Sequence, residues 1–319
     1  MARSPKSSDP IELALASLGG AGLTADQSPS LEVIPTDWAK MNDEVLGCGG
    51  LPRGKVIEIY AKASVGKSTL GYWFAGQTQK RDGKVAIFDS EGSYLAVYGE
   101  KFGIDNSQLL KPEFYYGEDA LQKLKVLIAL NVLDLVLIDS VPYLQPAQLI
   151  EHVDDKPYTM NQNLARAKML TNFFNDINGG YQIKPIDDPK GKWVLDVETG
   201  SNYHKIYHKK TSVIFINHAK TAVGVMFGPK TKTPGGDALD LASAIRLGMT
   251  HVKQSKKKDK ETGLPLFKIV KVKAAKNKVA PPYGEMEYRT WRSGGIELLE
   301  EDIEDQVEEL LEDEVEVDG

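Results

Sequence analysis

The sequence has almost no cysteine, no zinc-binding pattern and no apolar run long enough to cross a membrane. Cys48 is the only cysteine, so the chain can form no internal disulfide, and a reducing, intracellular compartment fits best. The opening residues, MARSPKSSDP, contain no apolar signal region, so secretion is not expected. The richest apolar stretch is interrupted by Asn131, Asp134 and Asp139, which excludes a membrane span there.

Basic residues are missing from one part of the chain. Residues 297–318 hold 13 carboxylates and no Lys or Arg, whereas the whole chain has 39 basic and 45 acidic residues. Residues 1–296 therefore carry a net charge of +7. A basic body with an acidic tail indicates an anionic partner and a segment that competes for the same site.

Between about residues 31 and 249, β-branched apolar runs alternate with helical periods. Strands are predicted at 55–60, 84–89, 135–139 and 212–217, and helices from about 67, at 119–130 and at 163–177. A Lys-rich turn at 253–263 precedes two more predicted strands, at 267–274 and 284–291. Continuous apolar strands between helices predict an α/β fold whose mostly parallel central sheet is flanked by helices.

The chain is predicted to have three parts. Residues 1–30 form an amphipathic helix at 8–20 and a polar linker, and this helix could dock on another subunit or pack on its own domain. Residues 31–296 form the core, and a turn-rich excursion at about 181–210 interrupts its alternation. Residues 297–319 form the acidic tail.

A phosphate-binding loop follows the first long strand. Residues 61–68, AKASVGKS, lie between a predicted strand and a predicted helix, which is the context that a P-loop requires. Lys67 would reach the β and γ phosphates of a nucleotide, and the Ser68 hydroxyl would bind Mg²⁺. Ala61 stands where the usual pattern has its first glycine, and a negative φ would accommodate it. The predicted nucleotide-binding residues here are Ala61, Lys62, Ala63, Ser64, Val65, Gly66, Lys67, Ser68 and Thr69.

Two carboxylates follow predicted parallel strands and would enter the same crevice. Asp139 ends the strand LVLID and is a candidate Mg²⁺ ligand, or else a cap of the next turn. Glu91 follows the strand VAIF and could orient or deprotonate a water, although on its own it fits a loop carboxylate equally well.

These motifs, in this order, resemble the RecA-type recombinases over about residues 31–296. GGLPRGKVIEIYAKASVGKST is similar to the family's segment through the P-loop, FDSEG to the strand end with the catalytic glutamate, and LDLVLIDSV to its Walker B strand. The most specific stretch is VIFINHAKTAVGVMFGPKTKTPGGDALDLASAIRL, and KVKAAKNKVAPPYGEMEY resembles the later strands.

The resemblance implies roles for single residues. Glu91 would be the catalytic carboxylate, and Tyr98 would stack on adenine. Lys276 and Lys278 would reach the γ-phosphate bound by a neighbouring subunit, although without the resemblance an exposed strand edge would be the better explanation. His218 occupies the sensor position, where the family commonly has Gln, and would signal to the loop at 219–236.

That loop would bind single-stranded DNA, and its glycines would make it mobile. The residue matching Val223 wedges between bases in the family, and the lysines would meet phosphates. A first DNA-binding loop would correspond to about residues 151–161. The predicted DNA-binding residues are Met160, Arg166, Lys220, Val223, Gly224, Met226, Phe227, Gly228, Lys230, Lys232, Gly235 and Gly236.

The resemblance implies an ATP- and Mg²⁺-dependent strand-exchange recombinase that forms helical filaments on single-stranded DNA and pairs it with duplex DNA. Single-strand-binding and loading proteins are further expected partners. A RecA-fold helicase, or a mediator or annealing protein that binds ATP, is the alternative. The large C-terminal domain of bacterial RecA has no counterpart, which suggests a viral or divergent relative acting in a bacterial cytosol.

Overall fold

The computed structural model describes residues 30–150, 161–179, 209–221 and 231–299. The chain divides into two units, Met1–Glu32 and Val33–Gly319, and the fold described here belongs to the second. The predicted N-terminal helix, most of the predicted insertion and the acidic tail beyond Leu299 lie outside the described residues.

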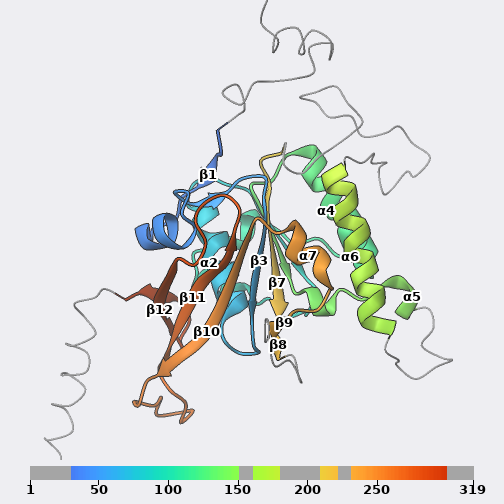
Figure 1. The fold of residues 1–319 in the computed structure, drawn as a ribbon. Coiled ribbons are helices and arrows are strands. Elements are labelled where there is room, and N and C mark those ends of the chain that lie inside the picture. The colour runs from blue at the N-terminus through green and yellow to red at the C-terminus, as the bar shows by residue number, and fades with distance from the viewer. Residues whose placement is uncertain (1–29, 151–160, 180–208, 222–230, 300–319) are drawn as a thin grey trace, which may run out of the picture. The chain divides into compact units, whose positions relative to one another are not determined.

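A nine-stranded sheet forms the centre of this unit (Figure 1). Its strand order is β13-β12-β11-β10-β3-β7-β6-β4-β5. Every neighbouring pair from β10 to β5 is parallel, and the three pairs from β10 to β13 are antiparallel. The predicted α/β fold with a mostly parallel sheet is therefore confirmed. The strands are β3 (Val56–Ala61), β4 (Val85–Asp89), β5 (Leu109–Leu110), β6 (Leu135–Asp139), β7 (Ser212–His218), β10 (Ile245–Gln254), β11 (Phe267–Asn277), β12 (Glu285–Trp291) and β13 (Ile296–Leu298).

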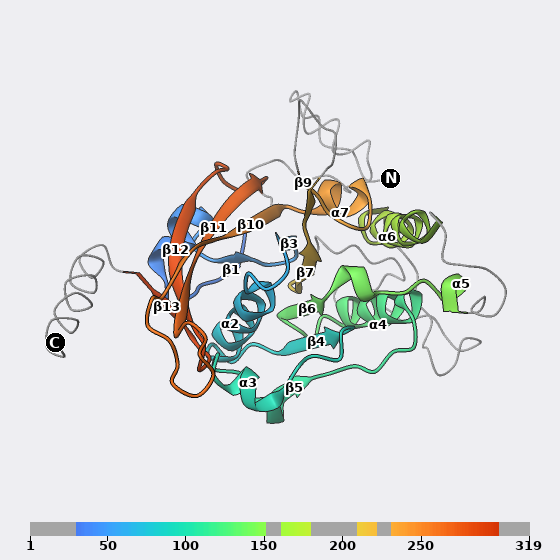
Figure 2. The ribbon, with the colours of Figure 1, turned by 90° about the horizontal axis from the view of Figure 1, so that it is seen from below.

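Helices cover both faces of the parallel strands (Figure 2). Helix α2 packs on one face, where Leu70 and Phe74 join a core with Leu137. Helices α4 and α6 pack on the other face, where Phe173 joins a second core with Ile138. Successive strand residues thus enter opposite cores, which explains the continuous apolar runs. The helices are α2 (Lys67–Gln79), α3 (Ala96–Glu100), α4 (Gly117–Leu130), α5 (Ala147–Ile150), α6 (Asn161–Gly179) and α7 (Asp237–Ala242), with short helical turns at Met41–Val45, Asn106–Gln108 and Val141–Tyr143.

Two small antiparallel pairs stand outside this sheet. Strand β1 (Val33–Ile34) pairs with β2 (Leu51–Pro52), and β8 (Lys220–Thr221) pairs with β9 (Thr231–Lys232). None of the described helices is long and apolar enough to cross a membrane.

The antiparallel part of the sheet differs most from the sequence-based expectation. Strand β10 was not predicted, and it extends to Gln254, inside the segment that was expected to begin a Lys-rich turn at 253. Its second half is exposed and polar apart from Val252, so that half lacks the buried alternation that indicates a strand. Strand β13 includes Glu297 and Leu298, so the predicted start of the acidic tail at 297 falls within the sheet.

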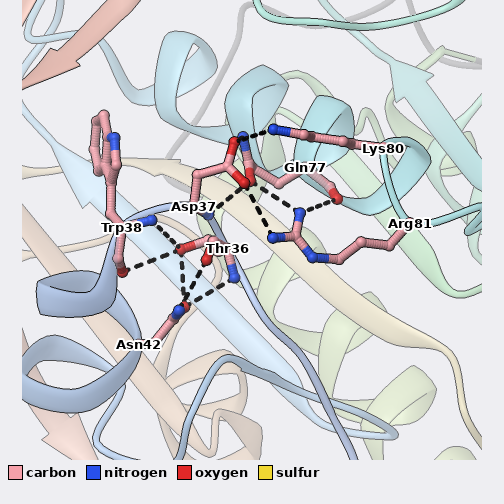
Figure 3. A network of polar contacts seen from close by, with 7 residues as sticks. All are labelled: Thr36, Asp37, Trp38, Asn42, Gln77, Lys80 and Arg81. Atoms are coloured by element: carbon pink, nitrogen blue, oxygen red, sulfur yellow. Dashed lines mark hydrogen bonds and ion pairs between the residues drawn. The ribbon is translucent and has the colours of Figure 1, made fainter.

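The segment after β1 is attached to the C-terminal end of α2 (Figure 3). The Asp37 carboxylate forms ion pairs with Lys80 at 2.8 Å and Arg81 at 3.1 Å, and it accepts a hydrogen bond from Gln77 at 3.0 Å. Hydrogen bonding to Lys80 is the main reason that the pKa of Asp37 falls to about 2, and Gln77 and Arg81 act in the same direction.

A second group of contacts shapes the same segment (Figure 3). The Thr36 backbone N–H and hydroxyl both donate to the Asn42 side-chain oxygen, and Asn42 returns a hydrogen bond to the Thr36 carbonyl. The Trp38 N–H donates to the Thr36 hydroxyl. Trp38 also packs on Trp73 of α2, with 4.1 Å between ring centroids. The helix that begins at the predicted P-loop is therefore held by charge at its far end and by packing near its middle.

Candidate nucleotide-binding site

The predicted P-loop connects β3 to α2 through a sharply turned backbone. Ser64 and Gly66 have positive φ angles of 61° and 109°, and α2 begins at the next residue, Lys67. A glycine suits Gly66 because other residues rarely adopt such a φ. Ala61 is the buried last residue of β3 and is not among the described residues with positive φ, so alanine fits where the usual pattern has glycine.

Lys67 is folded back over this loop. Its side chain is buried, and its Nζ donates to the Lys62 carbonyl at 3.0 Å. Burial lowers the pKa of Lys67, although the negative charges of Asp139 and Glu91 oppose the shift. A cation held between a backbone turn and two carboxylates is suited to receive the phosphates of a nucleotide.

Asp139 is a buried carboxylate with an incomplete set of contacts. Its Oδ2 accepts from the Tyr72 hydroxyl at 3.2 Å, whereas Oδ1 is buried with no hydrogen bond to any described residue. Burial, reinforced by the charge of Glu91, raises the pKa of Asp139 to about 6, and the nearby Ser68 hydroxyl lowers it. A buried oxygen without a partner, close to a hydroxyl, fits a divalent cation that binds oxygen ligands.

Glu91 lies beside Asp139 because β4 and β6 are parallel neighbours that end together, with Asp89 opposite Asp139. Its Oε1 accepts from the Ser140 hydroxyl at 2.5 Å and lies 3.5 Å from His218 Nε2. Glu91 is thus in contact both with the residue after Asp139 and with the last residue of β7. Sequence reasoning missed Ser140 and Tyr72, although Ser140 directly follows the predicted metal ligand.

A cavity of about 750 Å³ opens over the P-loop and Glu91. It is lined by the loop from Ala63 to Thr69 and by Glu91, Tyr98 and His218, all of which the sequence singled out. The Tyr98 hydroxyl lies 3.4 Å from Thr69 Oγ1. The size falls within the range of ligand-binding pockets. The cavity also has a wall that was not predicted, from β10, β11 and the end of β12, which includes Gln254, Lys268, Trp291 and Arg292.

Lys276 and Lys278 do not line this cavity. Lys276 is paired with Arg246 of β10, and Arg246 is paired with Glu58, three residues before the end of β3. The lysines therefore lie across β10 from β3, level with its first half rather than with the end that carries the P-loop. The described structure does not bring them to the nucleotide site of their own chain.

The predicted DNA-binding segment begins directly after His218. Strands β8 and β9 place the backbones of Lys220 and Lys232 opposite each other. Gly235 and Gly236 have φ angles of 99° and 68°, and a Cβ on Gly235 would lie 2.6 Å from Leu170 of α6. In the described structure these glycines permit a close turn onto α6 and into α7. Val223, Gly224, Met226, Phe227, Gly228 and Lys230 lie outside the described residues.

The first predicted DNA-binding loop is described only at its end. Met160 lies outside the described residues. Arg166 lies on α6, where its side chain is buried and its Nε donates to the Leu144 carbonyl at 3.3 Å. In the single chain Arg166 therefore contacts protein backbone rather than presenting its charge on the surface.

The site combines three features: a turned loop between a parallel strand and a helix, a buried lysine at the helix start, and two carboxylates at neighbouring strand ends. Together they define a P-loop nucleotide-binding protein of the α/β class. Comparison with known proteins narrows this class. The family model for the RecA N-terminal domain matches residues 16–179 and 202–297. The chain therefore belongs to the RecA family.

Curated relatives agree with this assignment. The chain is 33% identical over 277 residues to a protein named RecA from Fusobacterium nucleatum, covering 87% of this chain and 64% of the relative. It is 31% identical to RecA of Herpetosiphon aurantiacus, over 93% of this chain and 75% of the relative. It is 33% identical to RecA of Geobacter metallireducens, over 91% of this chain and 78% of the relative. The match therefore spans about two thirds to three quarters of the length of these relatives.

Proposed function

We propose that the protein is an ATP-dependent DNA strand-exchange recombinase that assembles into helical filaments on single-stranded DNA and pairs it with homologous duplex. One observation carries the proposal: Glu91, at the nucleotide cavity, is in contact with His218, and the predicted DNA-binding segment starts at the following residue. The nucleotide site and the DNA segment thus share one short stretch of backbone.

The phosphates of ATP would lie on the P-loop backbone, with Lys67 at the β and γ phosphates. Asp139 Oδ1 and the Ser68 hydroxyl would hold Mg²⁺, because the first is a buried oxygen without a hydrogen bond and the second lies beside it. The bound cation would neutralise charge on the phosphates. Tyr98 would stack on the base, since it borders the cavity on the side of α3.

Glu91 would orient the attacking water and accept its proton. A general base must lie within hydrogen-bond reach of the proton that it removes, and Glu91 borders the cavity next to Lys67 and Ser68. The Ser140 hydroxyl holds Glu91 Oε1 at 2.5 Å and so restricts the direction of the carboxylate.

His218 would report the state of the phosphates to DNA. Its ring lies 3.5 Å from the Glu91 carboxylate, and its backbone N–H donates a hydrogen bond to the Asn217 side-chain oxygen at 2.9 Å. A change at Glu91 on nucleotide binding would therefore move the start of β8. The segment 219–236 would bind single-stranded DNA through lysines at phosphates and apolar side chains at bases.

Lys276 and Lys278 would act on the ATP of a neighbouring subunit. Their position away from the cavity of their own chain supports a role in trans, because two cations at a subunit contact can stabilise charge that develops on a bound phosphate. ATP would then favour the filament, and hydrolysis would favour release.

The decisive experiment is joint-molecule formation between single-stranded DNA and homologous duplex, with and without ATP. We expect ATP-dependent joint molecules and none with a heterologous duplex. Unwinding without pairing would instead indicate a helicase, and annealing that needs no ATP would indicate a mediator. Lys67→Ala is the matched negative control, since it removes the phosphate contact and leaves the DNA segment unchanged.

A further inference from the structure

Lys276 and Lys278 already have partners in the single chain, at the C-terminal half of α7. Lys276 Nζ lies 3.1 Å from Asp240 Oδ1 and also donates to the Asp240 carbonyl. Lys278 Nζ donates to the Leu241 carbonyl at 2.7 Å. Carbonyls at the end of a helix carry partial negative charge and attract lysines. Both lysines are therefore drawn to α7 of their own subunit.

The contact of Asp240 continues into the interior. Asp240 Oδ2 lies 3.0 Å from Arg246 Nη1, and Arg246 Nε donates to the Glu58 carboxylate at 2.5 Å. Glu58 also accepts from Asn217 Nδ2 at 2.9 Å, and the same amide donates to the Pro234 carbonyl at 2.9 Å. A continuous polar chain thus joins Lys276 to both ends of the predicted DNA-binding segment, since Asn217 precedes it and Pro234 lies near its close.

The inner and outer parts of this polar chain differ in how easily they can break. Glu58 and Asn217 are fully buried, so losing either partner would leave a buried polar group unsatisfied. The side chains of Asp240 and Lys276 are 45% and 26% exposed. An ion pair in contact with water contributes at most about 1 kcal/mol, so a competing anion can displace it. The inner part is therefore a fixed support, and the outer pair is exchangeable.

We propose that Asp240 is a positioning residue that holds Lys276 in the unassembled subunit and yields it to the phosphate of a neighbouring subunit's nucleotide. The proposal rests on the proposed function of Lys276. Carboxylate and phosphate share the charge and the three N–H donors of one ammonium group, so the Asp240 pair weakens each contact of Lys276 with a neighbour. Asp240 then raises the ATP concentration needed for assembly.

The first test is Asp240→Asn, compared with Asp237→Asn, an exposed aspartate in the first turn of the same helix. We expect the ATP concentration for half-maximal filament assembly on single-stranded DNA to fall about threefold in Asp240→Asn and to stay unchanged in Asp237→Asn. The difference from wild type should shrink as salt rises, because salt screens exposed charges. An unchanged or increased ATP requirement would overturn the proposal.

A second measurement reads the contact without any nucleotide. Acetylation of Lys276 by an amine-reactive reagent, followed by mass spectrometry, should be faster in Asp240→Asn than in wild type, with Lys271 of the same strand as the internal reference. Equal rates at Lys276 would overturn the proposal. In a Lys276→Ala background, Asp240→Asn should leave the ATP requirement unchanged, and a persisting shift would also overturn it. Failure of the proposed function is read separately, from joint-molecule formation by the wild-type chain.

Discussion

The two ends of helix α2 hold carboxylates in opposite states. At the N-terminal end, Asp139 is buried, its pKa is raised to about 6, and Oδ1 has no hydrogen bond among the described residues. At the C-terminal end, Asp37 contacts Lys80, Arg81 and Gln77, and its pKa is lowered to about 2. One end leaves a buried oxygen without a partner, and the other satisfies its carboxylate within the chain. On the proposed function, the first serves ligand binding and the second serves stability.

The largest expected effect is at the N-terminal end of α2. Glu91→Gln should reduce DNA-dependent ATP hydrolysis by about 10²–10⁴-fold, because the amide cannot accept a proton from water. ATP binding and filament assembly should persist, since the lysine and the P-loop backbone remain. Steady-state phosphate release and nucleotide binding by fluorescence would measure the two separately.

Glu113→Gln, an exposed carboxylate outside the cavity, is the matched control and should hydrolyse ATP as wild type does. If Glu91→Gln turns over at the wild-type rate, Glu91 has no part in the chemistry.

Asp139→Asn should separate binding from stability at the same end. We expect Mg²⁺-dependent ATP affinity to fall about tenfold or more, because a neutral amide is a poorer ligand for the cation. Without nucleotide the variant should be more stable than wild type near pH 7, by about 1–3 kcal/mol, since burial disfavours the charged form of Asp139.

The pH dependence of that gain has a defined sign. The pKa of Asp139 is raised to about 6 in the folded protein from 3.8. The wild-type protein therefore loses stability as the pH rises through this window and Asp139 ionises. The advantage of Asp139→Asn should therefore be absent near pH 3.5 and complete above about pH 7. Urea unfolding across this range would measure it, and a variant less stable than wild type at neutral pH would contradict the account of Asp139 as an unsatisfied carboxylate.

The same contrast shows what the sequence could predict. Lys67, Asp139 and Glu91 were identified because each occupies a set position after an apolar strand, and parallel strands bring such positions to one edge. The cavity wall at Trp291 and Arg292 could not be found in this way. It depends on the antiparallel pairing of β11 with β12, which long-range register decides and no local motif marks.

The Asp240–Arg246–Glu58 chain was missed for a related reason. Its members are charged residues in a helix, β10 and β3, separated by up to 188 positions, and only the parallel pairing of β10 with β3 brings them together. Strand β10 itself was not predicted, although Ile245, Leu247 and Met249 alternate with less buried residues in its first half; only its exposed second half lacks that signal.

Phe227→Ala tests the DNA segment, which we expect to bind an external ligand, single-stranded DNA, just as we expect Asp139 to bind Mg²⁺. We expect single-stranded DNA affinity to fall by about 1–3 kcal/mol, the usual loss when an aromatic that stacks on a base is removed. Fluorescence anisotropy with a labelled oligonucleotide would measure it. Val132→Ala, an exposed apolar residue just after α4, is the control. Equal affinity for Phe227→Ala and wild type would remove this residue from the DNA interface.

The smallest expected effect is at the C-terminal end of α2. Asp37→Asn should lower the free energy of unfolding by about 1 kcal/mol at pH 7, because the carboxylate is 40% exposed and solvent screens its ion pairs. ATP hydrolysis should not change, since Asp37 lies at the opposite end of the helix from the P-loop.

The pKa of Asp37 is lowered to about 2 in the folded protein from 3.8. Its ionised carboxylate therefore contributes stability that is present above about pH 4 and is lost as the pH falls toward 2. The difference between Asp37→Asn and wild type should therefore vanish in this acidic window, as urea unfolding at several pH values would show. Asp43→Asn, an exposed aspartate in the same segment, should have no such effect. A stability difference for Asp37→Asn that stays constant from pH 7 to pH 2 would mean that packing, rather than the charge of Asp37, holds this end of α2.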